Sequence, residues 1–257
     1  YLFLLIIFID LSAGLSSIIY HLKMSSFQFK QFTILQDKCA MKVGTDGVLL
    51  GAWTPIDHNP YSILDIGAGT GVIALILAQR SNAEQIDALE IDDDAYEQAV
   101  DNFENSTWGD RLFCYHAGLD EFMEEPEDEY DLVISNPPFY TEDYKSGDEK
   151  RDMARFTDSL PFEDLTEAAS ILLSDIGILA VIIPYKEEER FIRLAAENKL
   201  FPVKITRVKG TPETDIKRSL LAFSRDENAV AVIDELVIEL SRHNYTAEYT
   251  ALTKEFY

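Results

Sequence analysis

Asp65-Ile-Gly-Ala-Gly-Thr-Gly71 is the stretch that decides the fold, because it joins an apolar strand-like segment to an apolar helix-like one. Ile63-Leu-Asp-Ile66 reads as a buried strand, and Val72–Ala78 reads as the helix that it feeds. Glycines at such a turn let the backbone approach a ligand closely and leave the first helical N–H groups free. The stretch therefore predicts a ligand-binding strand–turn–helix unit, with a purely structural tight turn as the alternative.

Strand-like and helix-like segments alternate outward from this turn, a pattern typical of βαβ units and a parallel sheet. Phe201–Val208 and Lys217–Ser224 follow one another without a helix, so a hairpin is expected near the end of the sheet. The sequence thus predicts an α/β, Rossmann-like fold: a mostly parallel seven-stranded sheet with an antiparallel strand near the end and helices on both faces. The other expected strands are Ser62–Ile66, Gln85–Glu90, Arg111–His116, Tyr130–Ser135 and Gly177–Ile183; the expected helices are Gly71–Arg80, Asp93–Asn105, Phe162–Leu173 and Lys186–Asn198.

The charge of the chain restricts its partners. With 47% hydrophobic residues it has enough apolar material for a core, but its formal net charge of -24 repels phosphate as a whole. One segment is different, because Lys199–Arg218 holds six basic residues against Glu213 and Asp215. An RNA-binding face would therefore have to be local. The 2 cysteines do not make a disulfide framework, and a reducing cytoplasm is the simpler assumption.

The first 23 residues differ from the rest. Tyr1–Ile9 is continuously apolar, but it lacks the basic start of a secretory signal, and Asp10 and His21 interrupt a membrane span of about 20 residues. Met24 is the preferred start of the protein. The alternatives are that the first 23 residues form a membrane-proximal helix or a packed helix, and no stable membrane partner is expected. The expected organisation is an apolar leader outside the native protein (1–23) and one domain (24–257) made of an N-terminal extension (24–61), a core (62–225) and a C-terminal strand and helix (226–257).

The glycine turn departs from a dinucleotide site. The fingerprint G-x-G-x-x-G needs a third glycine where this chain has Val72. Asp65 is poorly placed beside a pyrophosphate but well placed beside a cationic amino acid, and S-adenosylmethionine carries a positive sulfonium and ammonium and no phosphate. Glu90, at the end of the next strand, is spaced to accept hydrogen bonds from ribose hydroxyls, with a solvated acid as the alternative. The predicted cofactor is therefore S-adenosylmethionine, with Asp65, Gly67, Gly69, Gly71 and Glu90 at its site.

An acid after the third strand is the candidate for the adenine amino group of the cofactor. Asp120 is the nearest one, and its alternative role is to cap the following helix. Asp92, Asp93 and Asp94 are better explained as charges at a helix N-terminus. No metal-binding site is expected.

Asn136-Pro-Pro-Phe139 follows the fourth strand, and strand C-terminal ends are where open α/β sheets bind ligands. Proline removes donors, so the Asn136 side-chain oxygen and the Pro137 carbonyl are free to accept from an –NH₂ group. Two acceptors aim the nitrogen lone pair at the methyl donor, and Phe139 stacks on a flat substrate. The loop predicts methyl transfer to a planar amine, with a rigid turn and a core phenylalanine as the alternative. It does not name the base, because guanine-N2 and glutamine-amide methyltransferases use such tetrapeptides too.

Further stretches carry a family resemblance, which covers about Met24 to Tyr257. Their residues are Phe29-Lys-Gln-Phe32 with Cys39–Trp53 near the start, Asp65–Gly71, Ser135-Asn-Pro-Pro-Phe-Tyr140 and Ala154-Arg-Phe-Thr-Asp-Ser-Leu-Pro161 in the core, and Tyr245–Tyr249 with Leu252–Phe256 at the end. Together they make the chain similar to the bacterial tRNA1(Val) adenine-37 N6-methyltransferase family. Phe139 stands where that family often has tyrosine.

The resemblance implies a class I methyltransferase fold and a cytoplasmic enzyme that methylates N6 of the adenine beside the anticodon of one tRNA. It places Thr45 at the cofactor, and Lys42, Pro138, Tyr140 and Arg155 at the substrate. From the residues alone, Lys42 could instead be a solvated lysine. Thr45 could instead cap a helix over Val48–Trp53. The expected partner is the anticodon arm of tRNA1(Val), and a monomer is expected. The alternatives are guanine-N2 methylation of rRNA, N5-glutamine methylation of a protein, a non-catalytic RNA-binding factor and a membrane-attached form.

Overall fold

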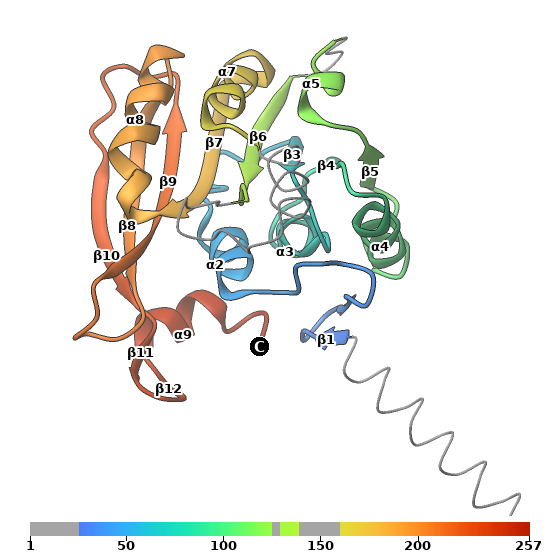
Figure 1. Ribbon diagram of the computed structural model, residues 1–257, viewed down its shortest axis with the longest axis horizontal. Helices are drawn as coiled ribbons and strands as arrows, with labels where there is room; N and C mark the ends of the chain where they lie inside the picture. The colour runs from blue at the N-terminus through green and yellow to red at the C-terminus, as the bar shows by residue number, and fades with distance from the viewer. Residues whose placement is uncertain (1–25, 125–128, 139–159) are drawn as a thin grey trace, which may run out of the picture.

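The fold is organised around one eight-stranded sheet, in a computed structural model that describes residues 26–124, 129–138 and 160–257 (Figure 1). The strand order is β10-β8-β9-β7-β6-β3-β4-β5. The bounds of the strands are β3 Ser62–Ile66, β4 Gln85–Glu90, β5 Leu112–His116, β6 Tyr130–Ser135, β7 Leu173–Pro184, β8 Phe201–Lys209, β9 Ile216–Ser224 and β10 Val232–Val237.

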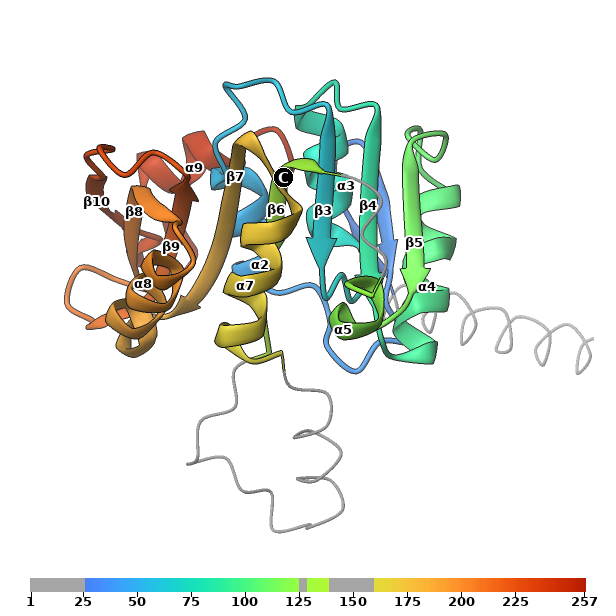
Figure 2. The same cartoon turned by 90° about the horizontal axis from the view of Figure 1, so that it is seen from above.

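Strand β9 is the antiparallel member of this sheet. It runs against both of its neighbours, β7 and β8, while every other pairing in the sheet is parallel (Figure 2). The expected hairpin between the last two core strands is therefore confirmed, as is the Rossmann-like α/β class. The count of seven strands was one too low, because Val232–Val237 pairs in parallel with Lys204–Lys209 and extends the edge beyond the hairpin.

Helices cover both faces of the sheet (Figures 1 and 2). Alternation along the strands explains this, since Ile63 belongs to one apolar core and its neighbour Leu64 to the other. One face carries α2, α3 and α4, and the opposite face carries α5, α7 and α8. The bounds are α2 Thr45–Trp53, α3 Val72–Arg80, α4 Asp93–Glu104, α5 Leu119–Phe122, α7 Phe162–Leu172 and α8 Glu188–Glu197, with a 3-10 turn, η1, at Tyr185–Glu187.

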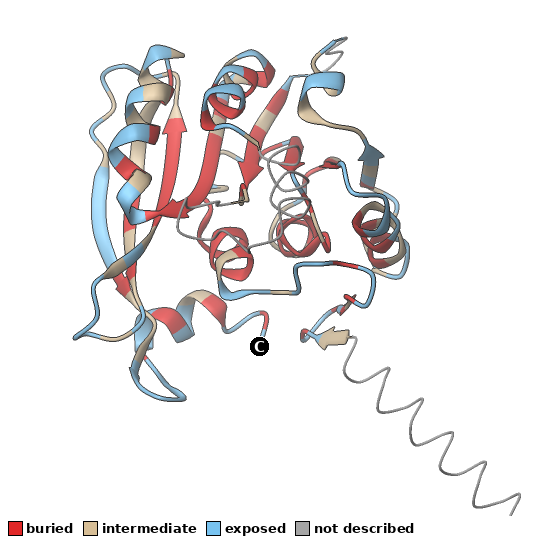
Figure 3. Cartoon of the chain, in the orientation of Figure 1, coloured by how far each residue is buried: buried red, intermediate tan, exposed pale blue. Residues whose placement is uncertain are grey.

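Burial follows the order of the sheet. Strands β7 and β9 are buried along most of their length, whereas the edge strands β5 and β10 are largely exposed (Figure 3). Within residues 26–124, 129–138 and 160–257, no helix has both the length and the apolar character needed to cross a bilayer.

The N-terminal extension packs against the end of the chain. It forms a small hairpin of β1 (Ser26–Gln28) and β2 (Thr33–Leu35), in which the Phe29 ring stacks on Phe32 at 4.5 Å and on Tyr257 at 5.7 Å. The tail itself contains β11 (Glu239–Ser241), β12 (Asn244–Tyr245) and α9 (Ala247–Thr253). These contacts hold the two terminal segments beside the core that lies under α2 and α3.

Candidate active site

Three neighbouring strands bring the predicted site residues to one edge of the sheet. Strand β3 pairs with β4 on one side and with β6 on the other, so Asp65 lies opposite both Ala88 and Ile134. Two residues beyond these partners come Glu90 at the end of β4 and Asn136 just after β6. The glycine turn, Glu90 and the Asn136 loop therefore share the edge formed by the carboxyl ends of the parallel strands.

The three glycines of the turn have different roles. Gly67, Gly69 and Gly71 all have positive φ values of 77°, 55° and 75°, which only glycine adopts without strain. A Cβ atom at Gly67 or Gly69 would meet nothing within 4 Å, whereas one at Gly71 would lie 2.5 Å from the Phe103 ring. Gly67 and Gly69 thus face open space. Gly71 is required by the packing of α3 against α4.

Asp65 is a buried carboxylate with one free oxygen. Its side chain is fully buried, and Oδ2 accepts a 3.2 Å hydrogen bond from the backbone N–H of Ala74. Oδ1 has no hydrogen-bond partner among the described residues. Burial raises the pKa of Asp65 to about 7, and the nearby negative charge of Glu90 adds to this, while the Ala74 bond opposes it. A buried carboxylate of this kind is a fitting partner for a cation.

Glu90 closes the turn from the next strand. Oε2 accepts a 2.7 Å hydrogen bond from the backbone N–H of Gly69, and Oε1 accepts one of 2.9 Å from that of Asp92. Glu90 is only 8% exposed, so the alternative of a solvated strand-end acid is wrong. Asp92 itself caps α4 by accepting from Ala95, as expected for a helix N-terminal acid. Each Glu90 oxygen keeps a lone pair for a ligand hydroxyl.

Asp120 lies in the first turn of α5, exposed and without a side-chain capping bond. The alternative role as a helix cap is therefore wrong. Its Oδ1 would be 2.5 Å from a Cβ atom built on Gly118, and the Ile91 side chain would be 3.4 Å from the same point. Gly118 thus lets the Asp120 carboxylate and the exposed Ile91 side chain lie close together beside Glu90. Ile91 was not singled out from the sequence, and its position directly after Glu90 is the only signal for it.

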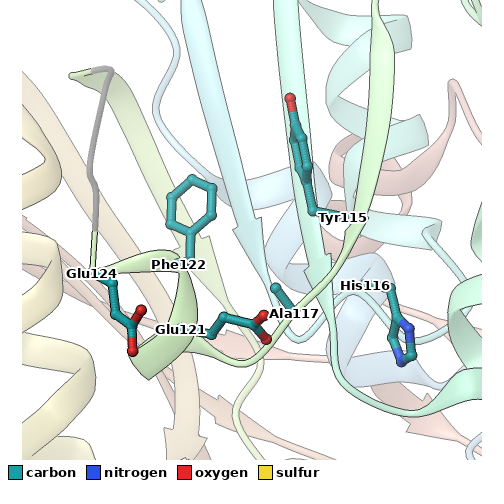
Figure 4. Close-up of a pocket in the computed structure, with 6 residues that line it drawn as sticks. All are labelled: Tyr115, His116, Ala117, Glu121, Phe122 and Glu124. Atoms are coloured by element: carbon teal, nitrogen blue, oxygen red, sulfur yellow. The ribbon is translucent and has the colours of Figure 1, made fainter.

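A surface hollow of about 380 Å³ lies farther along the same side, at the end of β5 (Figure 4). It is open rather than deep, and neither Asp65, Glu90 nor Asn136 contributes to it. The residues that line it are Tyr115, His116, Ala117, Glu121, Phe122 and Glu124. The hollow therefore borders the predicted cofactor end without containing the central residues.

Asn136 presents a second free acceptor. Its Oδ1 atom is buried and has no hydrogen-bond partner among the described residues. Pro137 is buried and Pro138 is half-buried, and Ser135 Oγ anchors the strand end by donating a 2.8 Å hydrogen bond to the Ile66 carbonyl. An amide oxygen held free in this way can accept a hydrogen from an amine. Phe139, Tyr140 and Arg155 lie outside the described residues.

Thr45 is the first residue of α2, Lys42 lies three residues before it, and both are exposed. Helix α2 packs closely on α3, since Gly47 and Gly51 allow contact with Val72 and Ile76. The residue before the helix is Gly44, which makes no side-chain cap, so the capping alternative for Thr45 is wrong. In the part of the chain that the structure describes, no hydrogen bond or ion pair joins Lys42 or Thr45 to Asp65 or Asn136, and the roles of Lys42 and Thr45 stay predictions.

Asp46 and Arg218 form a contact that the sequence prediction did not assign. Arg218 Nε donates a 2.7 Å hydrogen bond to Asp46 Oδ2 and so links the start of α2 to the start of β9. The two residues are far apart in the chain, and only their opposite charges could have suggested the pair. Other cations of the basic segment are paired too, Arg207 with Glu188 and Lys209 with Glu235.

Comparisons with known proteins agree with this geometry. The family described as "Methyltransferase small domain" matches residues 49–157, which include the glycine turn and the Asn136 loop. Among solved structures, the chain is similar to a protein described as a predicted O-methyltransferase from Agrobacterium tumefaciens, with a TM-score of 0.64 and 22% identity over 82% of this chain and 96% of that one. It is also similar to a ribosomal protein L11 methylase from Lactobacillus delbrueckii, with a TM-score of 0.54 and 17% identity over 75% and 84%. These two likenesses confirm the class I methyltransferase fold.

Curated relatives are much more similar in sequence, and three of them carry the name tRNA1(Val) (adenine(37)-N6)-methyltransferase. One from Flavobacterium johnsoniae is 73% identical over 90% of this chain and 98% of its own length. Others from Parabacteroides distasonis and Proteus mirabilis are 44% and 38% identical over 90% and 92% of this chain and 97% and 95% of theirs. The chain therefore belongs to the tRNA1(Val) (adenine(37)-N6)-methyltransferase family.

Proposed function

We propose that this protein transfers a methyl group from S-adenosylmethionine to the exocyclic N6 of adenine 37 in tRNA1(Val), the reaction that its relatives' name describes. The observation that carries the proposal is the pair of buried acceptors Asp65 Oδ1 and Asn136 Oδ1 at adjacent strands, neither of which has a hydrogen-bond partner among the described residues. The Asp65 oxygen suits a cationic methyl donor, and the Asn136 oxygen suits an amine that accepts the methyl group. A cationic donor and an amine are the two reactants of an N-methylation.

The described residues fit the cofactor. S-adenosylmethionine, when bound, supplies an electrophilic methyl group on a positively charged sulfur. Asp65 offers its free carboxylate oxygen to the positive end, while Gly67 and Gly69 leave room for close backbone approach. Glu90, held by Gly69 and Asp92, accepts from ribose hydroxyls, and Asp120 with Ile91 contacts the adenine. We assign Thr45, at the start of α2, to the entrance of the same cofactor site.

Asn136 and Pro137 prepare the acceptor nitrogen. The Asn136 amide oxygen and the Pro137 carbonyl each accept one N6 hydrogen, which favours a more tetrahedral nitrogen and aims its lone pair away from the ring. As positive charge develops on N6, these two oxygens stabilise it. A base inside a folded RNA must be swung out of its stack to reach them, and Phe139 is assigned to stack on it. Lys42, Pro138, Tyr140 and Arg155 are assigned to the substrate.

The test uses a tRNA1(Val) transcript, the protein and cofactor labelled in its methyl group. We expect one N6-methyladenosine per transcript by nucleoside mass spectrometry, and no label in a matched transcript that carries guanosine at position 37. Label on guanine-N2, or on glutamine of a protein present in the reaction, would contradict the proposal and favour the corresponding alternative. An unlabelled transcript together with normal cofactor binding would favour a non-catalytic RNA-binding role.

We also propose that the enzyme works in the cytoplasm as a monomer, since tRNA and the cofactor are both found there and the acceptors just described come from a single chain. Size-exclusion chromatography with light scattering checks the oligomeric state: a mass near 29.1 kDa is expected, and a stable dimer would contradict this part.

A further inference from the structure

Strand β6 divides the active-site edge into two halves of different charge. On one side, the ends of β3, β4 and β5 carry Asp65, Glu90 and the acids that begin α4 and α5. Of these acids, Asp65, Glu90 and Asp120 are assigned to the cofactor. RNA phosphates are repelled from such a surface, so the nucleic acid has to approach Asn136 from the side of β7 and β9.

The opposite half carries a group of cationic and aromatic residues, which we call the β7–β9 rim. Strand β7 ends at Pro184, which lies opposite Arg218 of β9, and Arg218 lies opposite Val208 of β8. Tyr185 and Lys217 each lie one residue beyond the Pro184–Arg218 pair. The rim consists of Tyr185, Lys186, Arg207, Lys217 and Arg218.

The rim is next to the catalytic loop. Ser135, the last residue of β6, lies opposite Val181 of β7, so Asn136-Pro-Pro138 runs beside the last residues of β7. Tyr185 follows directly in η1 and is 37% exposed. Nucleotides that flank an adenine held at Asn136 on the side of β7 therefore lie near this rim.

Two of the rim cations are fixed by ion pairs, and two are not. Arg207 makes a two-nitrogen contact with the buried Glu188 carboxylate at 2.7 and 3.1 Å, and its guanidinium lies 5.5 Å from the centre of the Tyr185 ring. Arg218 is bound to Asp46 at 2.7 Å. Lys186 and Lys217 are exposed, and neither forms an ion pair with another described residue. Their charges are therefore available to a polyanion.

We propose that the β7–β9 rim binds the RNA strand that flanks the target adenine. Lys186 and Lys217 contact backbone phosphates, and the Tyr185 ring, supported by Arg207, stacks on a neighbouring base. This inference rests on the proposed function, because it takes RNA as the substrate. It gives a chain with a net charge of -24 a local contact for a polyanion: the rim holds two lysines without an ion pair to a described residue, although the acids Glu187 and Asp215 lie close to them in the chain.

The first test removes the two unpaired charges together, in a Lys186→Ala/Lys217→Ala variant. Affinity for the tRNA1(Val) transcript is measured by fluorescence anisotropy at several salt concentrations. Each phosphate contact with a single strand contributes about 0.7 to the slope of log affinity against log salt, so we expect the slope to fall by about 1.4. The KM for the transcript should rise, while affinity for the cofactor, measured without RNA, should equal that of the wild type.

The matched control is Lys254→Ala, which removes an exposed lysine after α9, outside the active-site edge. It should leave the salt slope and the KM unchanged. If the double variant behaves like this control while the wild type methylates the transcript, the rim proposal is wrong and the proposed function stands. If the wild type does not methylate the transcript at all, the proposed function fails instead.

The second test concerns the ring of Tyr185. Stacking on one base is worth ~1–3 kcal/mol, so Tyr185→Ala should raise the KM for RNA by about fivefold or more. Tyr185→Phe keeps the ring and should have the wild-type KM. If the hydroxyl group of Tyr185 had a purely structural role instead, Tyr185→Phe would not restore this KM. An unchanged KM in Tyr185→Ala would exclude the stacking contact.

Discussion

The backbone N–H of Gly69 donates a 2.7 Å hydrogen bond to Oε2 of Glu90, and so ties the glycine turn of one strand to the end of the next. The other Glu90 oxygen holds the backbone of Asp92, which caps α4. One carboxylate thereby fixes two loops of the proposed cofactor site. Its two hydrogen bonds make Glu90 both a structural residue and a proposed ligand.

Replacement of Glu90 by glutamine should lower both the free energy of unfolding and the affinity for the cofactor. The glutamine NH₂ group cannot accept, so one of the two backbone N–H groups loses its partner, at a cost of about 1–3 kcal/mol in the free energy of unfolding. We expect cofactor affinity to fall at least about tenfold. Thermal unfolding and calorimetry measure the two effects; a variant that loses affinity with unchanged stability would show that Glu90 does not support the turn.

Asp65 should make stability depend on pH. Because burial raises its pKa from 3.8 to about 7, the folded protein binds more protons than the unfolded chain between these values. The contribution of Asp65 to the free energy of unfolding is therefore at its maximum below about pH 4, and it is lost as the pH rises through 7. The melting temperature of Asp65→Asn minus that of the wild type should increase from pH 5 to pH 8. An equal difference at all pH values would contradict the raised pKa.

The same carboxylate should make cofactor binding depend on pH with the opposite sign. The charged form attracts a cation, so with a pKa of about 7 the charged fraction, and with it the affinity, should rise about tenfold between pH 6 and pH 8. Asp65→Asn provides the control, since it should bind weakly with no such dependence on its own ionisation. Calorimetric titration at each pH measures both proteins.

Asn136→Ala should separate chemistry from cofactor binding. Loss of the amide oxygen removes one acceptor for the N6 hydrogens, and we expect the turnover number to fall by at least about 10²-fold. Cofactor affinity should stay within about twofold, because Asn136 is assigned to the amine. Asn136→Asp keeps an acceptor oxygen and should retain more activity than alanine. Unaffected turnover in Asn136→Ala would remove this residue from the mechanism.

Two glycines of the turn provide a matched pair of substitutions. Gly69→Ala meets open space and should cost about 1–2 kcal/mol from its positive φ alone. Gly71→Ala has the same backbone strain and also a Cβ atom 2.5 Å from Phe103, so a further ~1–3 kcal/mol of unfolding free energy is expected. Denaturant unfolding gives both values. Cofactor affinity should fall in Gly69→Ala even where the protein is fully folded; equal losses of stability in both variants would contradict the assigned roles.

Much of the site could be predicted from the sequence because its elements are local. Strand, turn and helix follow one another within Ile63–Ala78, and the spacing of Glu90 and Asn136 places both after later strands of the same sheet. Parallel strands bring their carboxyl ends to one edge, so linear order was enough to group Asp65, Glu90 and Asn136. The eighth strand was not predicted as part of the sheet, since Val232–Val237 has four exposed residues at its start and pairs along one side only.

The sequence by itself determined the fold class, the strand ends at which the candidate site lies and the chemistry of the Asp65 and Asn136 side chains. Only the tertiary structure decided which acceptors are free, that Gly71 serves packing while Gly67 and Gly69 face open space, and which cations are already paired. The physical reason is that hydrogen bonding, burial and ion pairing depend on partners distant in the chain. Arg218 with Asp46, 172 residues away, is such a pair.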